Sequence, residues 1–197
     1  MSDRIQKQLD FIVELDKMKS IFRHTILTDR SRRENDAEHS FHIATMAVIL
    51  REHSVYPDVD LTRVMKMLLV HDLVEIDAGD TFAYDDLGNE SRQLREDRAA
   101  ERIYGLLPED QGAELMALWR EFDAAATHDA KFAAALDRLQ PMLNNLHTDG
   151  HTWRESGVTV EKVRRRAEPI REAIPAVYEA VWPQIEGMLR DILGAGA

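Results

Sequence analysis

Residues 61–80 contain the pattern that most restricts how this chain can fold. Apolar residues recur there at helical spacing, at Leu61, Val64, Met65, Leu68 and Leu69. This spacing is typical of the buried face of an α-helix. His71, Asp72 and Glu75 follow at helical intervals, so we expect them to continue the same buried face. Because a buried charge must be paired or must bind a metal ion, we expect a divalent cation beside them.

The size and charge of the chain limit its class. Its 197 residues suit one domain spanning residues 1–197, and the hydrophobic fraction of 44% is enough for a core. Acidic residues outnumber basic ones by 36 to 25, which gives a formal net charge of −11. Such a surface repels nucleic-acid backbones, so we expect no nucleic acid polymer as a partner. A small anionic substrate is still compatible with a local positive field.

The chain contains no cysteine, which excludes disulfides, thiolate nucleophiles and thiolate metal ligands. Any metal ion must therefore be bound by nitrogen and oxygen ligands. The N-terminal segment has no apolar signal-peptide core, and the apolar stretch 43–50 is too short to span a bilayer. We therefore expect a soluble, cytoplasmic protein with no membrane contact.

Helical periodicity continues over most of the chain and predicts an all-α helical bundle with its metal site in the interior. The expected helices cover residues 3–21, 36 to a turn at 56–58, 61 to Gly79, 91–107, 108 through 122, 127–146, and 159–193 with breaks near Pro169 and Pro175. We expect a polar loop over 148–158 and no strand of consequence. The core of the domain is expected over residues 20–146, and the helices of 159–193 complete the bundle.

Two further candidate ligands lie on other predicted helices. His39 lies on the apolar face of the second helix, and Asp137 lies beside the apolar stripe of the helix that starts at Thr127. A single histidine on an apolar face is more often a hydrogen-bonded core residue than a ligand. His39, the His71-Asp72 pair and Asp137 come from three separate predicted helices, and together they indicate a metal site.

Two groups of arginines have less specific interpretations. The first lies in the polar segment 20–34 and consists of Arg23, Arg30, Arg32 and Arg33. This segment is either a solvated loop or an anion-binding loop, since guanidinium groups match the geometry of phosphate oxygens. The second group, Arg164-Arg165-Arg166, is predicted to be a solvated helix face.

The pattern H…HD…D resembles the HD-domain metal-dependent phosphohydrolases, with His39 in AEHS, His71-Asp72 in HDLVE and Asp137 in ALDRL. The match covers roughly residues 20–146. It is most similar to the branch that holds 5′-deoxynucleotidases, which remove phosphate from deoxynucleoside 5′-monophosphates. The resemblance implies an all-helical, usually dimeric protein with one divalent metal ion on His39, His71, Asp72 and Asp137.

The same resemblance implies roles for residues around the metal. Glu75 and Asp80 are expected to be catalytic acids near the attacking water and the leaving group, and Arg23 is expected to bind phosphate. His24 stands where the nucleotidases place a tryptophan that helps to exclude ribose, so the preference for deoxyribose is left open. We assign His24 and Arg33 to substrate binding as well.

The residues support this chemistry on their own. Two neutral imidazoles and two carboxylates give a neutral shell for a divalent cation and leave positions for a water and a phosphate oxygen. A carboxyl group could protonate the leaving alkoxide, and spacing does not decide between Glu75 and Asp80. We expect one metal ion per subunit. A second metal ion would need additional histidines between Asp72 and Asp137, and His128 is the only histidine there. Such ligands suit manganese, cobalt, iron, zinc or magnesium.

Three functions are compatible with these residues. The leading one is metal-dependent removal of phosphate from nucleoside or deoxynucleoside 5′-monophosphates by a homodimeric enzyme. The same site could instead hydrolyse a cyclic nucleotide, a nucleoside triphosphate or an alarmone. A third interpretation is a catalytically silent nucleotide-binding protein, although the complete ligand set with Glu75 and Asp80 argues against it.

Overall fold

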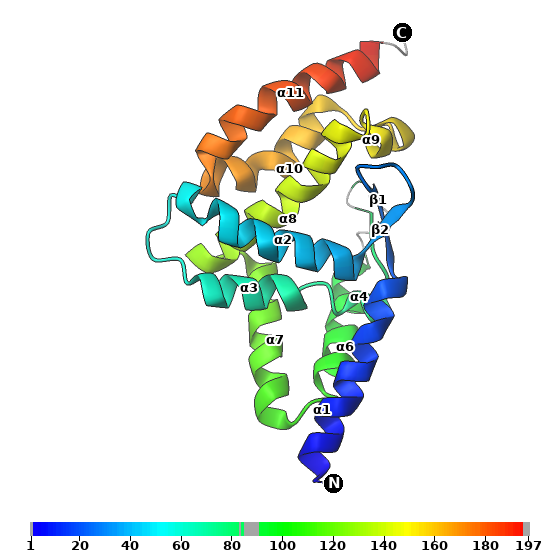
Figure 1. Cartoon of the computed structure of the whole chain (residues 1–197), viewed down its shortest axis with the longest axis vertical. Coiled ribbons are helices and arrows are strands. Elements are labelled where there is room, and N and C mark those ends of the chain that lie inside the picture. The colour runs from blue at the N-terminus through cyan, green and yellow to red at the C-terminus, as the bar shows by residue number, and fades with distance from the viewer. Residues whose placement is uncertain (1, 83, 85–90, 195–197) are drawn as a thin grey trace.

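The structure is a computed structural model and describes residues 2–82, 84 and 91–194. It is predominantly helical, which confirms the all-α prediction, and its long helices form two groups (Figure 1). The lower group in this view contains α1 (Asp3–Glu14), α6 (Arg92–Tyr104) and α7 (Glu109–Ala124). The upper group contains α2 (Asp36–Leu50), α3 (Leu61–Val70), α8 (His128–His147), α10 (Val160–Ala173) and α11 (Pro175–Gly194).

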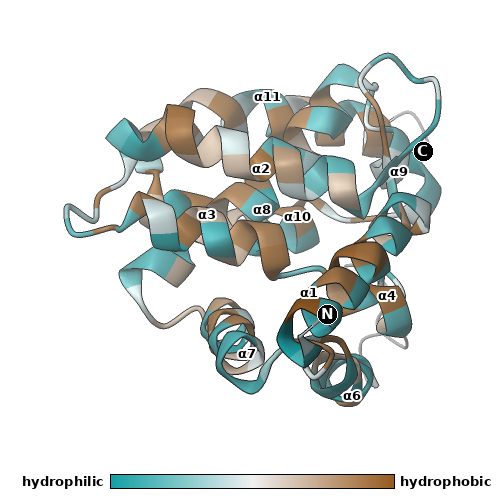
Figure 2. Ribbon diagram, turned by 60° about the horizontal axis from the view of Figure 1, so that its bottom comes forward, coloured by the Kyte–Doolittle hydropathy of each residue, from teal (hydrophilic) through white to brown (hydrophobic). Residues whose placement is uncertain are grey.

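Helix α8 lies at the centre of the upper group and packs against α2, α3, α7 and α10. It buries Phe132, Leu136 and Leu139, three residues of the predicted apolar stripe. Figure 2 shows hydrophobic residues on α2, α3 and α8 where these helices lie together. One hydrophobic cluster extends from Phe11 in α1 to Leu189 in α11, so the C-terminal helices share this core. Within the described residues, no helix has the length and apolar character needed to cross a membrane.

A short hairpin replaces the predicted loop between the first two helices. After the 3₁₀ helix η1 (Leu15–Ser20), strand β1 (Phe22–Ile26) pairs with strand β2 (Arg33–Asn35) in antiparallel orientation. Phe22 lies opposite Asn35, and Ile26 lies opposite Arg33, with an irregularity between these pairs. The sequence predicted no strand of consequence, and among the described residues this two-stranded hairpin is the only sheet. The segment is short, polar and rich in arginine, so it carries little of the apolar alternation that predicts a strand.

The central predicted helix ends earlier than its periodicity indicates. Helix α3 starts at Leu61, as predicted, after the Asp60 cap, but it ends at Val70. The chain then turns through bonds between residues three apart, from Leu73 N–H to the Val70 carbonyl and from Glu75 N–H to the Asp72 carbonyl. A separate short helix, α4 (Glu75–Ala78), follows. It stops at Gly79, whose φ of +73° is strained for other residues, and this confirms the predicted stop.

The C-terminal part differs from the prediction at two places. The predicted loop over 148–158 contains the short helix α9 (His151–Ser156), which lies between Gly150 and Gly157, both with positive φ. Helix α10 continues through Pro169 and the chain breaks only before Pro175. A proline removes one backbone donor, and packing of α10 on α8 and α11 holds the helix together in spite of that loss. The 3₁₀ helix η2 (Arg51–His53) extends α2.

Candidate metal centre and active site

His39 is held by the well-defined start of α2. The Asn35 side chain accepts a hydrogen bond from the Glu38 N–H at 3.0 Å, and the Glu38 carboxylate accepts one from the Asn35 N–H at 3.2 Å. This reciprocal cap fixes the first turn of the helix. Asn35 is therefore the N-cap of α2. His39 lies one turn further along the helix and is fully buried.

The other three predicted ligands come from the end of α3 and the middle of α8. His71 and Asp72 are the first residues after α3, and the His71 Nδ1 donates to the Leu68 carbonyl at 2.9 Å. This bond fixes the ring and leaves Nε2 directed into the interior. Asp137 lies in α8 and is 4% exposed. The sequence placed His71 and Asp72 within a helix, whereas the structure places them in the turn that follows it.

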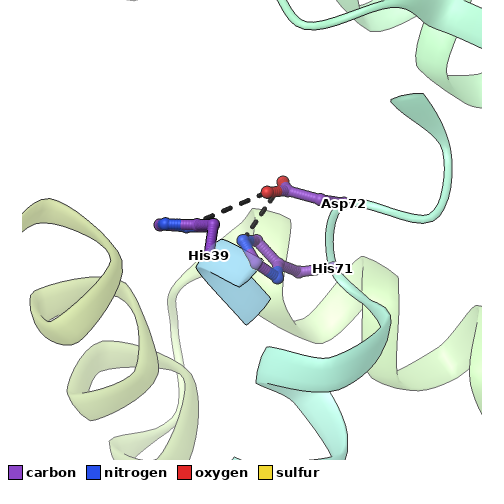
Figure 3. Close-up of side chains that lie close together, drawn as sticks. All are labelled: His39, His71 and Asp72. Carbon is purple, nitrogen blue, oxygen red and sulfur yellow. Dashed lines mark ion pairs between the residues drawn. The ribbon is translucent and has the colours of Figure 1, made fainter. Parts of the chain in front are cut away.

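The structure brings all four side chains together. The His39 Nε2 lies 3.0 Å from the Asp137 Oδ1 and 3.9 Å from the Asp72 Oδ2. The His71 Nε2 lies 3.1 Å from the Asp72 Oδ1 and 3.7 Å from the Asp137 Oδ1. Figure 3 shows the carboxylate of Asp72 directed toward both imidazoles, which come from α2 and from the turn after α3. Two nitrogens and two carboxylates therefore converge from three segments.

The hydrogen bonds of the two imidazoles fit a divalent metal ion. The His39 Nδ1 lies 3.1 Å from the Gln140 Oε1, and the His71 Nδ1 bonds a backbone carbonyl, so both Nε2 atoms are free to act as ligands. Among the described residues, the His71 Nε2 has no hydrogen-bond partner although it is buried. One ligand atom from each of His39, His71 and Asp72 lies within 4.8 Å of the others. An ion that prefers nitrogen and oxygen ligands suits this arrangement.

The electrostatics keep the aspartates ionised and one imidazole neutral. Burial opposes their charge, but Arg138 with the two histidines holds the pKa of Asp137 well below its usual value. The pKa of Asp72 is likewise lowered, because His71 and Arg23 outweigh the effect of burial. Burial lowers the pKa of His39, so this ring is neutral and can bind a cation. Burial also opposes a charge on His71, yet Asp72 and Asp137 raise its pKa to about 10, so the two carboxylates favour a positive charge at its Nε2, which a proton or a metal ion can supply.

A second group of carboxylates lies beside the four residues. Asp36, Glu75 and Asp80 each offer an oxygen within 4.8 Å of the others. Burial raises the pKa of Glu75 well above its usual value and also raises that of Asp80. Burial and the nearby Asp72 raise the pKa of Asp36 to about 7. The raised pKa values favour the protonated forms of these carboxyl groups, as a proton donor requires.

The structure places two of the three predicted substrate-binding residues at the site and the third outside it. Arg23 in β1 reaches the centre, where its Nη1 lies 2.7 Å from the Asp72 Oδ2 and 3.3 Å from the Asp36 Oδ1. His24 lies beside Phe82, with 4.5 Å between the ring centroids. Arg33 does not reach the site: it is exposed on β2 and lines neither cavity described below. Successive residues of a strand point to opposite faces, and on β2 the inward position belongs to Glu34.

Two adjoining cavities meet at this site. The first, about 120 Å³, is lined by His71, Asp72 and Asp137 together with Glu75. We call it the metal-side cavity. The second, about 60 Å³, is lined by aromatic side chains, and we call it the aromatic cavity. Its aromatic residues and histidine are His24, Phe82, Tyr84 and Trp153. Five residues line both cavities: Arg23, Asp80, Thr81, Arg138 and Arg166.

The model of the HD domain family matches residues 15–178 of this chain. The chain belongs to the HD domain family. Its HD domain is also similar to the crystal structure of a predicted metal-dependent phosphohydrolase from Magnetospirillum magnetotacticum MS-1. The two share 50% sequence identity and a TM-score of 0.90, over 95% of this chain and 93% of that one.

Curated relatives of this HD domain carry a more specific name. The 5′-deoxynucleotidase HDDC2 of Homo sapiens is 33% identical over 112 residues, which are 57% of this chain and 53% of that protein. The protein of the same name from Mus musculus is 34% identical over 110 residues, or 56% of this chain and 53% of that protein. The match spans about half the length of these relatives.

Sequence reasoning missed three residues of this HD-domain site. Asp36 lies three positions before His39, so helical spacing could have indicated it. Arg138 follows Asp137 directly and forms an ion pair with it. Arg166 belongs to the run that was predicted to be solvated, but only Arg164 and Arg165 are exposed. Three consecutive helical residues span about 200° of the helix, so they do not all face solvent.

Proposed function

We propose that this protein is a metal-dependent phosphohydrolase that removes phosphate from nucleoside 5′-monophosphates. The observation that carries the proposal is the convergence of His39, His71, Asp72 and Asp137 beside a group of buried, proton-holding carboxylates. The names of its relatives, a 5′-deoxynucleotidase and a metal-dependent phosphohydrolase, support the same reaction class. We assign the four converging residues as ligands of one divalent metal ion per subunit.

The metal ion, when bound, would lower the pKa of a water molecule and offset negative charge on the phosphoryl group. The Arg23 guanidinium would donate to phosphate oxygens. Its Nη1 lies 2.7 Å from the carboxylate of Asp72, a proposed metal ligand, so it is close to the position of a phosphate bound to the metal ion. Glu75 and Asp80, whose pKa values are raised by burial, would supply the proton to the leaving nucleoside oxygen. Asp36 holds Arg23 from the other side and so positions its guanidinium.

The aromatic cavity supports a nucleoside as the leaving group. The ring of Phe82 lies between those of His24 and Tyr84, with centroid distances of 4.5 and 5.3 Å. Flat apolar surfaces of this kind can stack on a nucleobase. His24 takes the position of the tryptophan that helps to exclude ribose in similar nucleotidases. We therefore propose that both ribo- and deoxyribonucleotides are accepted.

We also propose a homodimer that resides in the cytoplasm. Phe41, Val48 and Ile49 on α2 remain 54–71% exposed, and a second copy of the chain would cover such an apolar face. Light scattering would then give twice the mass of 22.6 kDa. A monomer at micromolar concentration would contradict the dimer, and recovery outside the cytoplasmic fraction would contradict the location.

One experiment tests the reaction and its alternatives. Protein loaded with manganese, cobalt, iron, zinc or magnesium would be assayed for released phosphate with nucleoside monophosphates, triphosphates and cyclic phosphates. We expect activity on the monophosphates and none after chelation of the metal ion. Activity on triphosphates or cyclic phosphates alone would contradict the proposed substrate class. Tight nucleotide binding without turnover with every metal ion would contradict an enzyme.

A further inference from the structure

Arg166 reaches the active site from the C-terminal helix α10. The inner face of this helix buries Val163, Ala167 and Ile170 against the core. Arg166 lies three residues after Val163, so its side chain leaves the helix next to this buried face. It lines both the metal-side cavity and the aromatic cavity. Helix α10 supplies none of the proposed metal ligands and none of the proposed proton donors. Arg166 therefore adds to the site a residue from a different helix.

The neighbouring arginines are neutralised, but Arg166 is not. Arg23 lies within hydrogen-bond distance of Asp72 and Asp36, and Arg138 forms an ion pair with Asp137. Throughout the part of the chain that the structure describes, no carboxylate forms an ion pair or a hydrogen bond with Arg166. Burial, with a further contribution from the adjacent Arg138, lowers its pKa to about 9. A second cation thus lies beside Arg166 where an anion is needed.

The other acidic groups of the site do not supply that anion. Glu75, Asp80 and Asp36 form no ion pair with Arg166 in the described part of the chain, and burial raises the pKa of each, which disfavours their charged forms. Arg166 is half-buried, and a cation withdrawn from water without a counter-ion is costly, so an anionic ligand would stabilise it. A phosphate group is dianionic near neutral pH. Its oxygens match the planar donors of a guanidinium group.

The position of Arg166 indicates where that phosphate lies. The residues shared by the two cavities include Arg23, Arg138 and Arg166, so these three guanidinium groups surround the junction. A phosphate there faces His71, Asp72 and Asp137, which line the metal-side cavity, on one side. On the other side it faces the aromatic residues Phe82, Tyr84 and Trp153. This arrangement fits a terminal phosphate attached to a single flat, aromatic group.

We propose that Arg166 binds the substrate's phosphate group at the junction of the two cavities, together with Arg138 and Arg23. This inference deepens the proposed function, because it takes the anion to be a phosphomonoester of a nucleoside. It predicts that α10, which lies outside the segment carrying the HD motif, is required for substrate affinity. Arg166 is then a substrate-binding residue and has no part in holding the metal ion.

The test compares Arg166→Met with Arg165→Met in metal-loaded protein. Methionine keeps an unbranched stem for packing and removes the charge. Arg165 is the exposed neighbour on the same helix, so its variant matches the chemical change. Calorimetric titration with inorganic phosphate should show about 10- to 100-fold weaker binding for Arg166→Met and wild-type binding for Arg165→Met. Equal phosphate affinity in wild type and Arg166→Met would overturn the proposal.

Thermal unfolding separates ligand binding from a structural role. Phosphate should raise the melting temperature of the wild type and of Arg165→Met, but much less that of Arg166→Met. Without phosphate, loss of a half-buried cation that has no ion pair among the described residues should leave the melting temperature of Arg166→Met unchanged or higher. A lower melting temperature of Arg166→Met without phosphate, with an unchanged phosphate-induced rise, would show a purely structural role and overturn the proposal.

A further variant keeps the inference testable if Arg166→Met does not fold. Arg166→Lys retains a cation but cannot bridge two phosphate oxygens, so it should bind phosphate several-fold more weakly and raise KM more than it lowers kcat. Wild-type phosphate affinity in Arg166→Lys would overturn the proposal. These titrations do not depend on turnover. If the wild type hydrolyses no monophosphate, the proposed function fails, while the phosphate titration still decides the role of Arg166.

Discussion

Gln140 lies against His39 and determines which nitrogen of that imidazole carries the proton. The Gln140 Nε2 donates to the Glu34 Oε1 at 2.6 Å, so its Oε1 faces the His39 Nδ1 at 3.1 Å and accepts a hydrogen bond from it. The His39 Nε2 is then unprotonated and directed toward Asp137. A glutamine buried in α8 thus orients the proposed metal ligand His39 on α2, which connects the two helices through the site.

Replacing Gln140 by leucine should weaken metal binding while the four ligands remain in place. Loss of a residue that orients a ligating histidine lowers metal affinity by about 10- to 100-fold. Competition of the protein with a chelating dye for manganese or cobalt would measure the change. Gln184→Leu is the control, because Gln184 is exposed on α11. Unchanged metal affinity in Gln140→Leu would show that Gln140 does not orient His39.

Metal stoichiometry tests the ligand assignment directly. His39→Ala should lose its bound metal ion, since one of two imidazoles is removed from a site with four ligands. His53→Ala should retain one metal ion per subunit, because His53 is exposed in η2. Elemental analysis after loading and desalting would give both values. Two metal ions per wild-type subunit would contradict the single-metal assignment, and a metal-loaded His39→Ala would contradict His39 as a ligand.

Glu75→Gln should lower turnover far more than metal affinity. Glu75 is 6% exposed, and burial raises its pKa, so it holds the proton that a leaving alkoxide needs. Removal of a general acid costs roughly 10²- to 10⁴-fold in kcat. The measurement is kcat for a nucleoside monophosphate together with the Kd for the metal ion. The exposed Glu179→Gln on α11 is the control. Intact turnover in Glu75→Gln would remove Glu75 from the mechanism.

The sugar preference should depend on His24. The wild type is expected to hydrolyse a ribonucleotide and its 2′-deoxy analogue with similar kcat/KM, because His24 is smaller than the tryptophan of similar nucleotidases. His24→Trp should increase the ratio in favour of the deoxynucleotide. His24 lines the aromatic cavity beside Phe82, so a larger ring there takes space from the substrate. If the ratio of kcat/KM values were the same in the wild type and in His24→Trp, residue 24 would not determine the sugar preference.

The sequence was sufficient to predict the helical fold class and the four residues that the structure brings together. His39, His71, Asp72 and Asp137 are recognisable because helical spacing puts each near an inward face, and their order in the chain matches a known motif. The turn after Val70 was not predictable in this way. Periodicity continues to Glu75, whereas the backbone changes to bonds between residues three apart once the metal-site side chains must converge.

Arg166 and Arg33 show why substrate residues are harder to predict than ligands. Both lie in runs of arginine, and composition does not tell which member of a run faces inward. In α10 the answer depends on the register of Val163 and Ala167 against the core, and in β2 it depends on the pairing with β1. Both are set by tertiary packing. The apolar positions around Arg166 could have indicated that it faces the site. No comparable pattern in the sequence could have excluded Arg33 from the site.

Two helical glycines should respond in opposite directions to the same substitution. Gly112 in α7 is buried, and a Cβ there would collide with the backbone carbonyl of Tyr104 at the end of α6. The hydroxyl of Tyr104 donates to the Val70 carbonyl at 2.9 Å, just before His71. Gly187 in α11 is exposed, and a Cβ there meets no atom within 4 Å among the described residues. Alanine substitutions at these two glycines therefore distinguish the effect of steric overlap on stability from the effect of helix propensity.

Gly112→Ala should lower the free energy of unfolding by about 1–3 kcal/mol, because a backbone contact cannot move as a side chain can. Gly187→Ala should raise it by about 0.5–1 kcal/mol, because alanine restricts the unfolded chain and favours the helix. Urea unfolding of the metal-free proteins would measure both changes. Equal stabilisation by the two substitutions would mean that α7 does not approach α6 as closely as the structure places it.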